Sequence, residues 1–208
     1  MTTPAFISLI AAARSAHDSC APIRAFCRFP DDLTETPWTP FWIPAAELME
    51  QEDRWADTVA VPTLFDVFLA ASADARWRET YKGTEIGDDF MNRFGCFCMI
   101  GPDAPWSSEQ MFGFVVYMPP HLWYPWHQHP AEELYFVIAG SGEFFREGEP
   151  TETLVAGQGS FHASGQPHAL RTHDAPLMAY VIWRNNFETA PYLCPGRSLA
   201  PPEAGPVQ

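Results

Sequence analysis

The chain has 208 residues, which suits one domain or one domain with a sizeable extension. Hydrophobic residues make up 47% of it, so it can bury a core, and this composition argues against global disorder. The formal net charge is −14 and Lys82 is the single lysine. With no basic surface to neutralise phosphates, a nucleic-acid partner is not expected.

The cysteines and the N-terminus both favour a cytoplasmic protein. The five cysteines are odd in number, lack a C-x-x-C pair, and stand at Cys20, Cys27, Cys96, Cys98 and Cys194. This usage is typical of reduced thiols rather than of a disulfide framework. Residues 6–13 are apolar, but no Lys or Arg precedes Arg14, so the charged leading region of a signal peptide is missing. No apolar run approaches the length of a membrane span, and a membrane partner is not expected.

Helical patterns dominate before residue 90. Segments 4–19, 44–55 and 63–77 carry apolar residues at helical spacing, such as Leu64, Val67, Phe68 and Ala71 in the third segment. Thr3 and Pro4 are typical of an N-cap and a first helical turn. The proline-rich residues 36–44 separate the first two segments. We therefore predict an N-terminal α-helical cap over residues 1–90.

Strand patterns dominate after residue 90. They cover segments 94–100, 111–118, 134–139, 142–145, 153–155 and 178–183, with turn signals at 139–142, 147–150 and 157–159. Short strands with frequent turns indicate a sandwich or a small barrel. The predicted fold is mainly β, with a barrel over residues 91–187 on which the helical cap packs. The tail at 188–208, rich in Pro, Ala and Gly, is expected to be loose.

A cluster of histidines and one glutamate suggests a metal site. Six of the seven histidines lie after residue 120, and His127 and His129 stand two apart. On an extended chain such side chains share a face, and Glu133 and Tyr135 obey the same rule. Neutral imidazoles and one carboxylate suit a first-row divalent ion, with His168 as a candidate third imidazole. The two histidines taken alone are equally compatible with a chance pairing on a polar strand face.

The spacing of these residues resembles the two motifs of the cupin superfamily. His127-x-His129, three residues, Glu133, six residues and Gly140 match the first motif, while Gly157, Gly165 and His168 match the second. Ala163, Thr172 and His121 depart from the motifs at positions that do not bind metal. The resemblance implies a double-stranded β-helix (jelly-roll) barrel over about residues 94–185. It also implies one divalent transition metal held by His127, His129, Glu133 and His168, for which Zn, Fe, Mn, Co and Ni are all suitable.

Aromatic residues near the motif suggest further roles. Tyr135 follows Glu133 by two residues and should face the same cavity, where a nearby cation would stabilise its phenolate as a base. A core tyrosine with a satisfied hydroxyl is the alternative. Trp123, Tyr124, Trp126 and Trp183 are concentrated enough to suggest a pocket for an onium cation, although each alone also suits a barrel core.

Together these features resemble the small bacterial cupin dimethylsulfoniopropionate (DMSP) lyases. That family combines a helical cap with the motif Tyr-Pro-x-His-x-His-x-x-x-Glu-x-Tyr, matched here by Tyr124, Pro125, His127, His129, Glu133 and Tyr135. The resemblance implies that a small zwitterion, DMSP, is cleaved to dimethyl sulfide and acrylate. It implies Tyr135 as the base, with Tyr124, His127 and Trp183 lining the substrate pocket. A ferrous cupin dioxygenase and a non-catalytic ligand-binding cupin are the alternatives, and the sequence is compatible with a homodimer.

Overall fold

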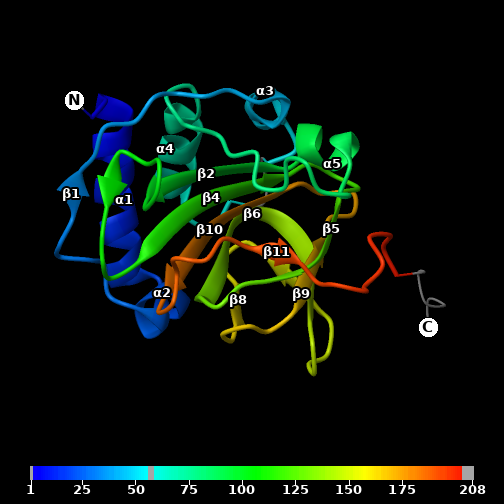
Figure 1. Cartoon of the computed structure of the whole chain (residues 1–208). Coiled ribbons are helices and arrows are strands. Elements are labelled where there is room, and N and C mark those ends of the chain that lie inside the picture. The colour runs from blue at the N-terminus through cyan, green and yellow to red at the C-terminus, as the bar shows by residue number, and fades with distance from the viewer. Residues whose placement is uncertain (1, 56–58, 203–208) are drawn as a thin grey trace.

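A computed structural model describes residues 2–55 and 59–202 of the chain (Figure 1). Its helices, all before the main strands, are α1 (Pro4–Ser19), α2 (Ala21–Phe26), α3 (Pro44–Gln51), α4 (Pro62–Ser72) and α5 (Asp88–Arg93). Its strands are β1 (Thr34–Glu35), β2 (Gly95–Ile100), β3 (Trp106–Ser107), β4 (Phe112–Met118), β5 (Trp123–Gln128), β6 (Glu132–Arg146), β7 (Glu152–Val155), β8 (Gly159–His162), β9 (His168–Arg171), β10 (Leu177–Arg184) and β11 (Tyr192–Leu193).

The strands form the predicted jelly-roll barrel. Their order is β1-β3-β2-β4-β10-β6-β9-β5-β11, and β7 and β8 also pair with β6. The first part of β6 pairs with β10 and β8, and its second part pairs with β7 and β9, so this one strand belongs to both sheets. The prediction of a mainly β cupin barrel with a helical cap is confirmed.

A bend at Gly140 lets β6 pass from one sheet to the other. The sequence predicted a turn between two strands at residues 139–142, whereas the structure has one continuous strand. Gly140 adopts a φ of 75°, and a Cβ there would lie 1.7 Å from the carbonyl oxygen of Pro176. Only glycine tolerates both conditions, so this motif glycine marks a close backbone approach rather than a chain reversal.

The central strands are hydrophobic on both faces because both faces are buried. Alternate residues of β2, β4, β6 and β10 face the barrel interior, namely Cys96, Cys98, Phe114, Val116, Tyr135, Val137, Val181 and Trp183. The residues between them face the helices, namely Phe97, Met99, Val115, Tyr117, Phe136, Ile138, Tyr180 and Ile182. This period of two places Glu133 and Tyr135 on the inner face of β6.

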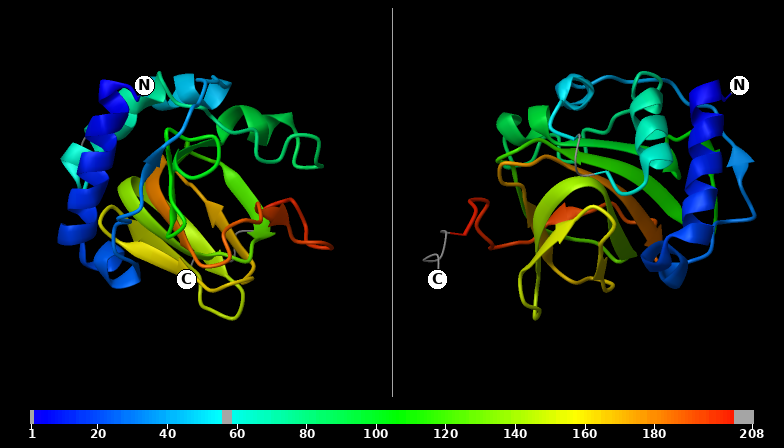
Figure 2. Two further views of the ribbon diagram at one scale, coloured as in Figure 1. Left: turned by 60° about the vertical axis from the view of Figure 1, so that its left-hand side comes forward. Right: turned by 180° about the vertical axis from the view of Figure 1, so that it is seen from behind.

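The helices cover the outer face of this sheet. α1 and α4 lie side by side against it, as Figures 1 and 2 show from three directions. α1 has the predicted bounds, and a proline occupies the first turn of α1, α3 and α4. Thr3 is the N-cap residue of α1, as predicted, although its side chain makes no capping hydrogen bond. α3 and α4 end earlier than the patterns suggested, at Gln51 and Ser72.

Part of the expected loose tail is paired to the barrel. β11 pairs with β5, and the backbone N–H of Cys194 donates to the carbonyl oxygen of Trp126 at 2.9 Å. The Arg197 guanidinium lies 4.3 Å from the Trp126 ring centroid. The structure thus differs from the expectation over these residues, because strand pairing and a cation–π contact fix them. Residues 203–208 lie outside the described part of the chain.

All five cysteines are free thiols. Within residues 2–55 and 59–202, no helix is both long and apolar enough to cross a bilayer.

Candidate active site

Three of the four predicted metal ligands form one buried cluster. Glu133 lies at the start of β6, His129 directly after β5, and His168 at the start of β9. Their ligand atoms all lie within 4.8 Å of one another. Nε2 of His129 is 3.4 Å from Oε1 of Glu133, and Nε2 of His168 is 3.1 Å from Oε2. The strands therefore bring together residues that are up to 39 positions apart in the sequence.

His127 lies beside this cluster and lines the same cavity. It is the cross-strand partner of His168, and the two ring centroids are 4.1 Å apart. Its other side stacks on Tyr124 at 3.8 Å with nearly parallel planes. His127 is not part of the compact trio, so its role as a fourth ligand stays a prediction.

Backbone carbonyls fix the tautomers of these three histidines. Nδ1 of His127 lies 2.8 Å from the oxygen of Pro125, Nδ1 of His129 lies 3.1 Å from that of Ala131, and Nδ1 of His168 lies 2.8 Å from that of Gln166. Because a carbonyl only accepts, each Nδ1 carries the proton and donates it. Each Nε2 is then left with its lone pair, as metal-binding histidines require.

The Nε2 atoms of His129 and His168 have no hydrogen-bond partner among the described residues. Nε2 of His129 and of His168 are buried and make no hydrogen bond within the described residues, although each faces an oxygen of Glu133. Two acceptors facing one another need a proton or a metal cation between them. The residues present therefore fit a divalent ion with nitrogen and oxygen ligands.

The charges of the cluster also suit a cation. Burial by itself would raise the pKa of Glu133, but interactions with His129, His162 and His168 hold it well below its usual range, so the carboxylate is ionised. Burial holds the pKa of His127 well below its usual value, and burial lowers the pKa of His162 to about 3. At neutral pH these two imidazoles are uncharged, and the carboxylate supplies the negative charge.

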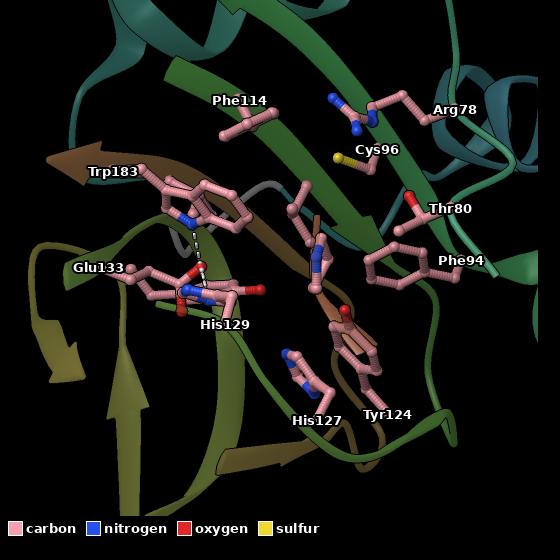
Figure 3. Close-up of a pocket in the computed structure, with 14 residues that line it drawn as sticks. Arg78, Thr80, Phe94, Cys96, Phe114, Tyr124, His127, His129, Glu133 and Trp183 are labelled. Carbon is pink, nitrogen blue, oxygen red and sulfur yellow. Dashed lines mark hydrogen bonds and ion pairs between the residues drawn. The ribbon is translucent and has the colours of Figure 1, made fainter. Parts of the chain in front are cut away.

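Trp183 lines the cavity and also contacts the cluster directly. Its indole Nε1–H donates to Oε1 of Glu133 at 2.6 Å, because the two residues are cross-strand partners in β10 and β6 (Figure 3). Its ring lies 4.1 Å from that of His129. The hydrogen bond was not predicted, and it gives this tryptophan a second role.

Tyr135 lines the cavity with an unengaged hydroxyl. This hydroxyl makes no hydrogen bond within the described part of the chain. Burial, followed by the charge of Glu133, holds the pKa of Tyr135 well above its ordinary value of about 10. A phenolate at this position therefore needs a positive charge nearby.

Tyr124, the other predicted pocket tyrosine, is tied to the N-terminal segment. Its hydroxyl lies 2.7 Å from that of Tyr81, which comes from the loop between α4 and α5. The same loop contributes Arg78 and Thr80 to the cavity lining. Arg78 makes no ion pair with a carboxylate of the described residues, and its guanidinium lies 5.4 Å from the Phe114 ring.

Comparisons with known proteins place the chain in a family. The family model for dimethylsulfoniopropionate lyase matches residues 20–179. The curated dimethylsulfoniopropionate lyase DddQ of Ruegeria pomeroyi is 49% identical over 192 residues, which are 92% of this chain and 95% of the relative.

The chain belongs to the dimethylsulfoniopropionate lyase family.

Solved structures of this family have the same fold. The crystal structure of DddQ from R. pomeroyi superposes with a TM-score of 0.90 at 48% identity, covering 92% of this chain and 97% of that one. A structure from the DMSP lyase pair RdDddP and RnDddQII gives a TM-score of 0.84 at 32% identity, covering 91% of this chain and 97% of the other. The likeness extends over the helical cap as well as the barrel.

Sequence reasoning missed several residues of this lyase-family site. Arg78, Thr80 and Tyr81 lie before the barrel, in a segment with no pattern that points to a cavity. Ser160 and His162 were passed over because residues 157–159 carry a turn signal. In this strand Ser160 and His162 are buried and Phe161 is exposed, which is the reverse of what the hydrophobic pattern predicts, so no local signal in the sequence points to these two residues.

Proposed function

We propose that this protein cleaves DMSP to dimethyl sulfide and acrylate by β-elimination, with Tyr135 as the base. The observation that carries the proposal is its 49% identity to DddQ over nearly the whole chain. The site supports it, because an unengaged tyrosine hydroxyl, a His and Glu cluster and aromatic side chains line one cavity. No serine lines this cavity within the described residues, so hydrolytic chemistry with a serine nucleophile is not favoured.

The cavity offers complementary surfaces to a zwitterion. Tyr124, Phe114 and Trp183 present aromatic rings to which a sulfonium is attracted by cation–π interaction. Arg78 also lines the cavity, and its positive charge favours an anionic group there. A divalent ion held by His127, His129, Glu133 and His168 would supply the positive charge that stabilises both the substrate carboxylate and the phenolate of Tyr135.

Tyr135 would carry out the proton transfer. Its phenolate oxygen takes the proton from the carbon next to the carboxylate, and the C–H electron pair forms the new carbon–carbon double bond. The bond between the β-carbon and sulfur breaks, and its electron pair leaves with sulfur as neutral dimethyl sulfide. Because the leaving group is neutral, no general acid is needed. Tyr135 then returns its proton to solvent.

The test is direct detection of the volatile product. Purified protein loaded with a divalent transition metal should release dimethyl sulfide from DMSP into the headspace and leave an equal amount of acrylate, without consuming oxygen. A chelator should abolish the release, and added metal should restore it. Folded, metal-loaded protein that yields no dimethyl sulfide, or that consumes oxygen in step with turnover, would contradict the proposal.

Trp183 allows the two roles of one side chain to be separated. Trp183→Phe keeps an aromatic wall but removes the N–H that binds Glu133, and we expect kcat/KM to fall about tenfold. Trp183→Ala also removes the aromatic face, and we expect a further loss of about tenfold. Initial rates normalised to metal content measure both effects. Equal activity per folded molecule in the parent and the Ala variant would rule out both roles.

Further proposals concern the setting of the site. The five free thiols support a cytoplasmic location, where such thiols stay reduced. We also propose that residues 1–90 act as a cap on a barrel formed by residues 91–187, and that the ion is one of Zn, Fe, Mn, Co or Ni. A homodimer stays a prediction that size measurements in solution can check.

A further inference from the structure

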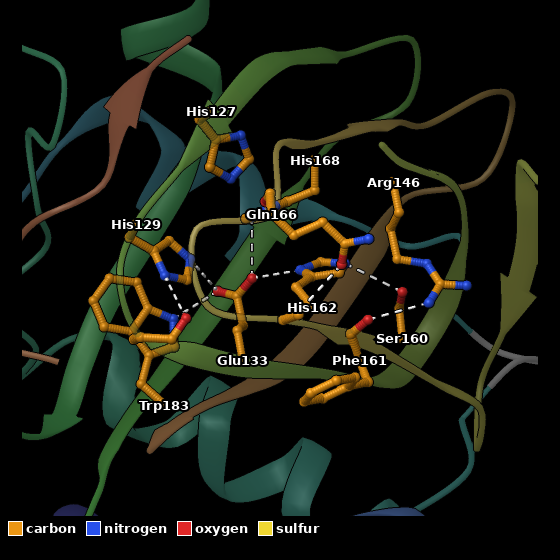
Figure 4. A network of polar contacts seen from close by, with 12 residues as sticks. His127, His129, Glu133, Arg146, Ser160, Phe161, His162, Gln166, His168 and Trp183 are labelled. Carbon is orange, nitrogen blue, oxygen red and sulfur yellow. Dashed lines mark hydrogen bonds and ion pairs between the residues drawn. The ribbon is translucent and has the colours of Figure 1, made fainter. Parts of the chain in front are cut away.

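The strand β8 lies beside β6 and adds two polar side chains to the buried cluster. His162 is the cross-strand partner of Glu133, and Ser160 is that of Tyr135. Both polar residues are about 98% buried or more, whereas Phe161 between them is 42% exposed. The strand register therefore turns Ser160 and His162 toward Glu133 (Figure 4).

Two hydrogen bonds connect Ser160 to His162 and His162 to Glu133, and the donor of each can be assigned. Nδ1 of His162 lies 2.6 Å from Oε2 of Glu133, and an ionised carboxylate only accepts, so Nδ1–H donates. The other ring nitrogen, Nε2, then carries a lone pair. Ser160 Oγ lies 3.2 Å from Nε2, and its O–H donates to it. Ser160 thus fixes the tautomer of His162, and His162 binds Glu133.

Both oxygens of Glu133 are consequently held from opposite sides. Oε1 accepts from Trp183 on β10, and Oε2 accepts from His162 on β8, both at 2.6 Å. Two short bonds to a charged acceptor prevent the carboxylate from rotating about its terminal bond. Each oxygen keeps a lone pair on the side of His129 and His168, at 3.4 and 3.1 Å.

We propose that His162, held by Ser160, is a positioning residue that fixes the Glu133 carboxylate in the orientation required to bind the divalent ion. The proposal rests on the metal site of the proposed function but not on its substrate. A ring that donates to a ligand carboxylate and is itself fixed by a second bond is the arrangement that tunes metal affinity in many sites.

Ser160, His162 and Glu133 have the residue types of a hydrolase triad, but their placement excludes that role. A nucleophilic serine needs a hydroxyl that a substrate can reach. Ser160 is 2% exposed and does not line the cavity that holds Tyr135 and Trp183. The hydroxyl is therefore a structural donor.

An isosteric pair of variants tests the proposal. In His162→Asn, the side-chain nitrogen stands where Nδ1 stood and can still donate to Glu133. His162→Leu has the same branched shape without a donor. We expect His162→Leu to weaken binding of Zn²⁺ by about 10- to 100-fold, measured by competition with a chelator, and His162→Asn to stay within about threefold of the parent. We also expect kcat at saturating metal to fall in the Leu variant with KM little changed.

Each outcome decides the question. Parent-like Zn²⁺ affinity in His162→Leu overturns the proposal, and so does an equal loss in both variants, because packing alone would then explain it. If His162→Leu does not fold, Ser160→Ala serves instead: it should weaken Zn²⁺ binding several-fold, and unchanged affinity counts against the proposal. Zn²⁺ affinity is read without substrate, so a protein that releases no dimethyl sulfide can still confirm or refute this role.

Discussion

Replacing Tyr135 by Phe is expected to leave the fold and the metal content unchanged and to lower dimethyl sulfide release by about a hundredfold or more, the usual contribution of a positioned base. The substitution removes one oxygen and keeps the ring that packs against Phe144 and His162. Since the hydroxyl makes no hydrogen bond within the described residues, its loss leaves no partner unsatisfied. Stability should therefore change little.

Three measurements on this variant decide the role of Tyr135: metal content, thermal melting and product formation. Tyr117→Phe is a matched control, because Tyr117 faces the helices rather than the cavity and should keep near-parent activity. A metal-loaded, folded Tyr135→Phe protein with near-parent lyase activity would show that Tyr135 is not the base. The base would then have to be sought in His127 or in a hydroxide on the ion.

Substituting His129 or His168 by Ala is expected to remove the bound metal and, with it, all measurable turnover. Each change deletes a buried Nε2 that faces Glu133 and leaves the carboxylate with fewer compensating partners. Purified parent protein should carry about one transition-metal ion per chain by elemental analysis.

A histidine outside the cluster provides the control for this prediction. His121 is largely exposed and contacts Asp174 at 3.5 Å, so His121→Ala should remain metal-loaded. If His129→Ala and His168→Ala carry as much metal as His121→Ala, the predicted site is wrong. The same series with His127→Ala would establish whether His127 is a fourth ligand or only a wall of the cavity.

The core of the site could be predicted because it is encoded locally. His127, His129, Glu133 and Tyr135 lie within nine residues, and period-two spacing predicts that the two members of each pair share a face. The barrel strands were visible as apolar runs because β2, β4 and β10 are buried on both sides. The pattern within one strand is therefore enough to predict which of its side chains share a face.

The rest depends on strand pairing, which the sequence does not display. Trp183 and His162 contact Glu133 because β10 and β8 flank β6 in a particular register. Tyr81 meets Tyr124 across 43 residues by the packing of an irregular loop. In each case the contact depends on tertiary structure, and no local sequence pattern predicts it.

The hydroxyl contact between Tyr81 and Tyr124 has a consequence for how members of this family can exchange parts. One tyrosine lies before residue 90 and the other after it, and the bond between them joins the two halves of the chain at the cavity wall. A chimera with a crossover at residue 90 inherits one tyrosine from each parent. Such a recombinant keeps this contact only where the donor of the N-terminal half also supplies a hydroxyl at position 81, so exchanging the barrel alone changes the support of Tyr124.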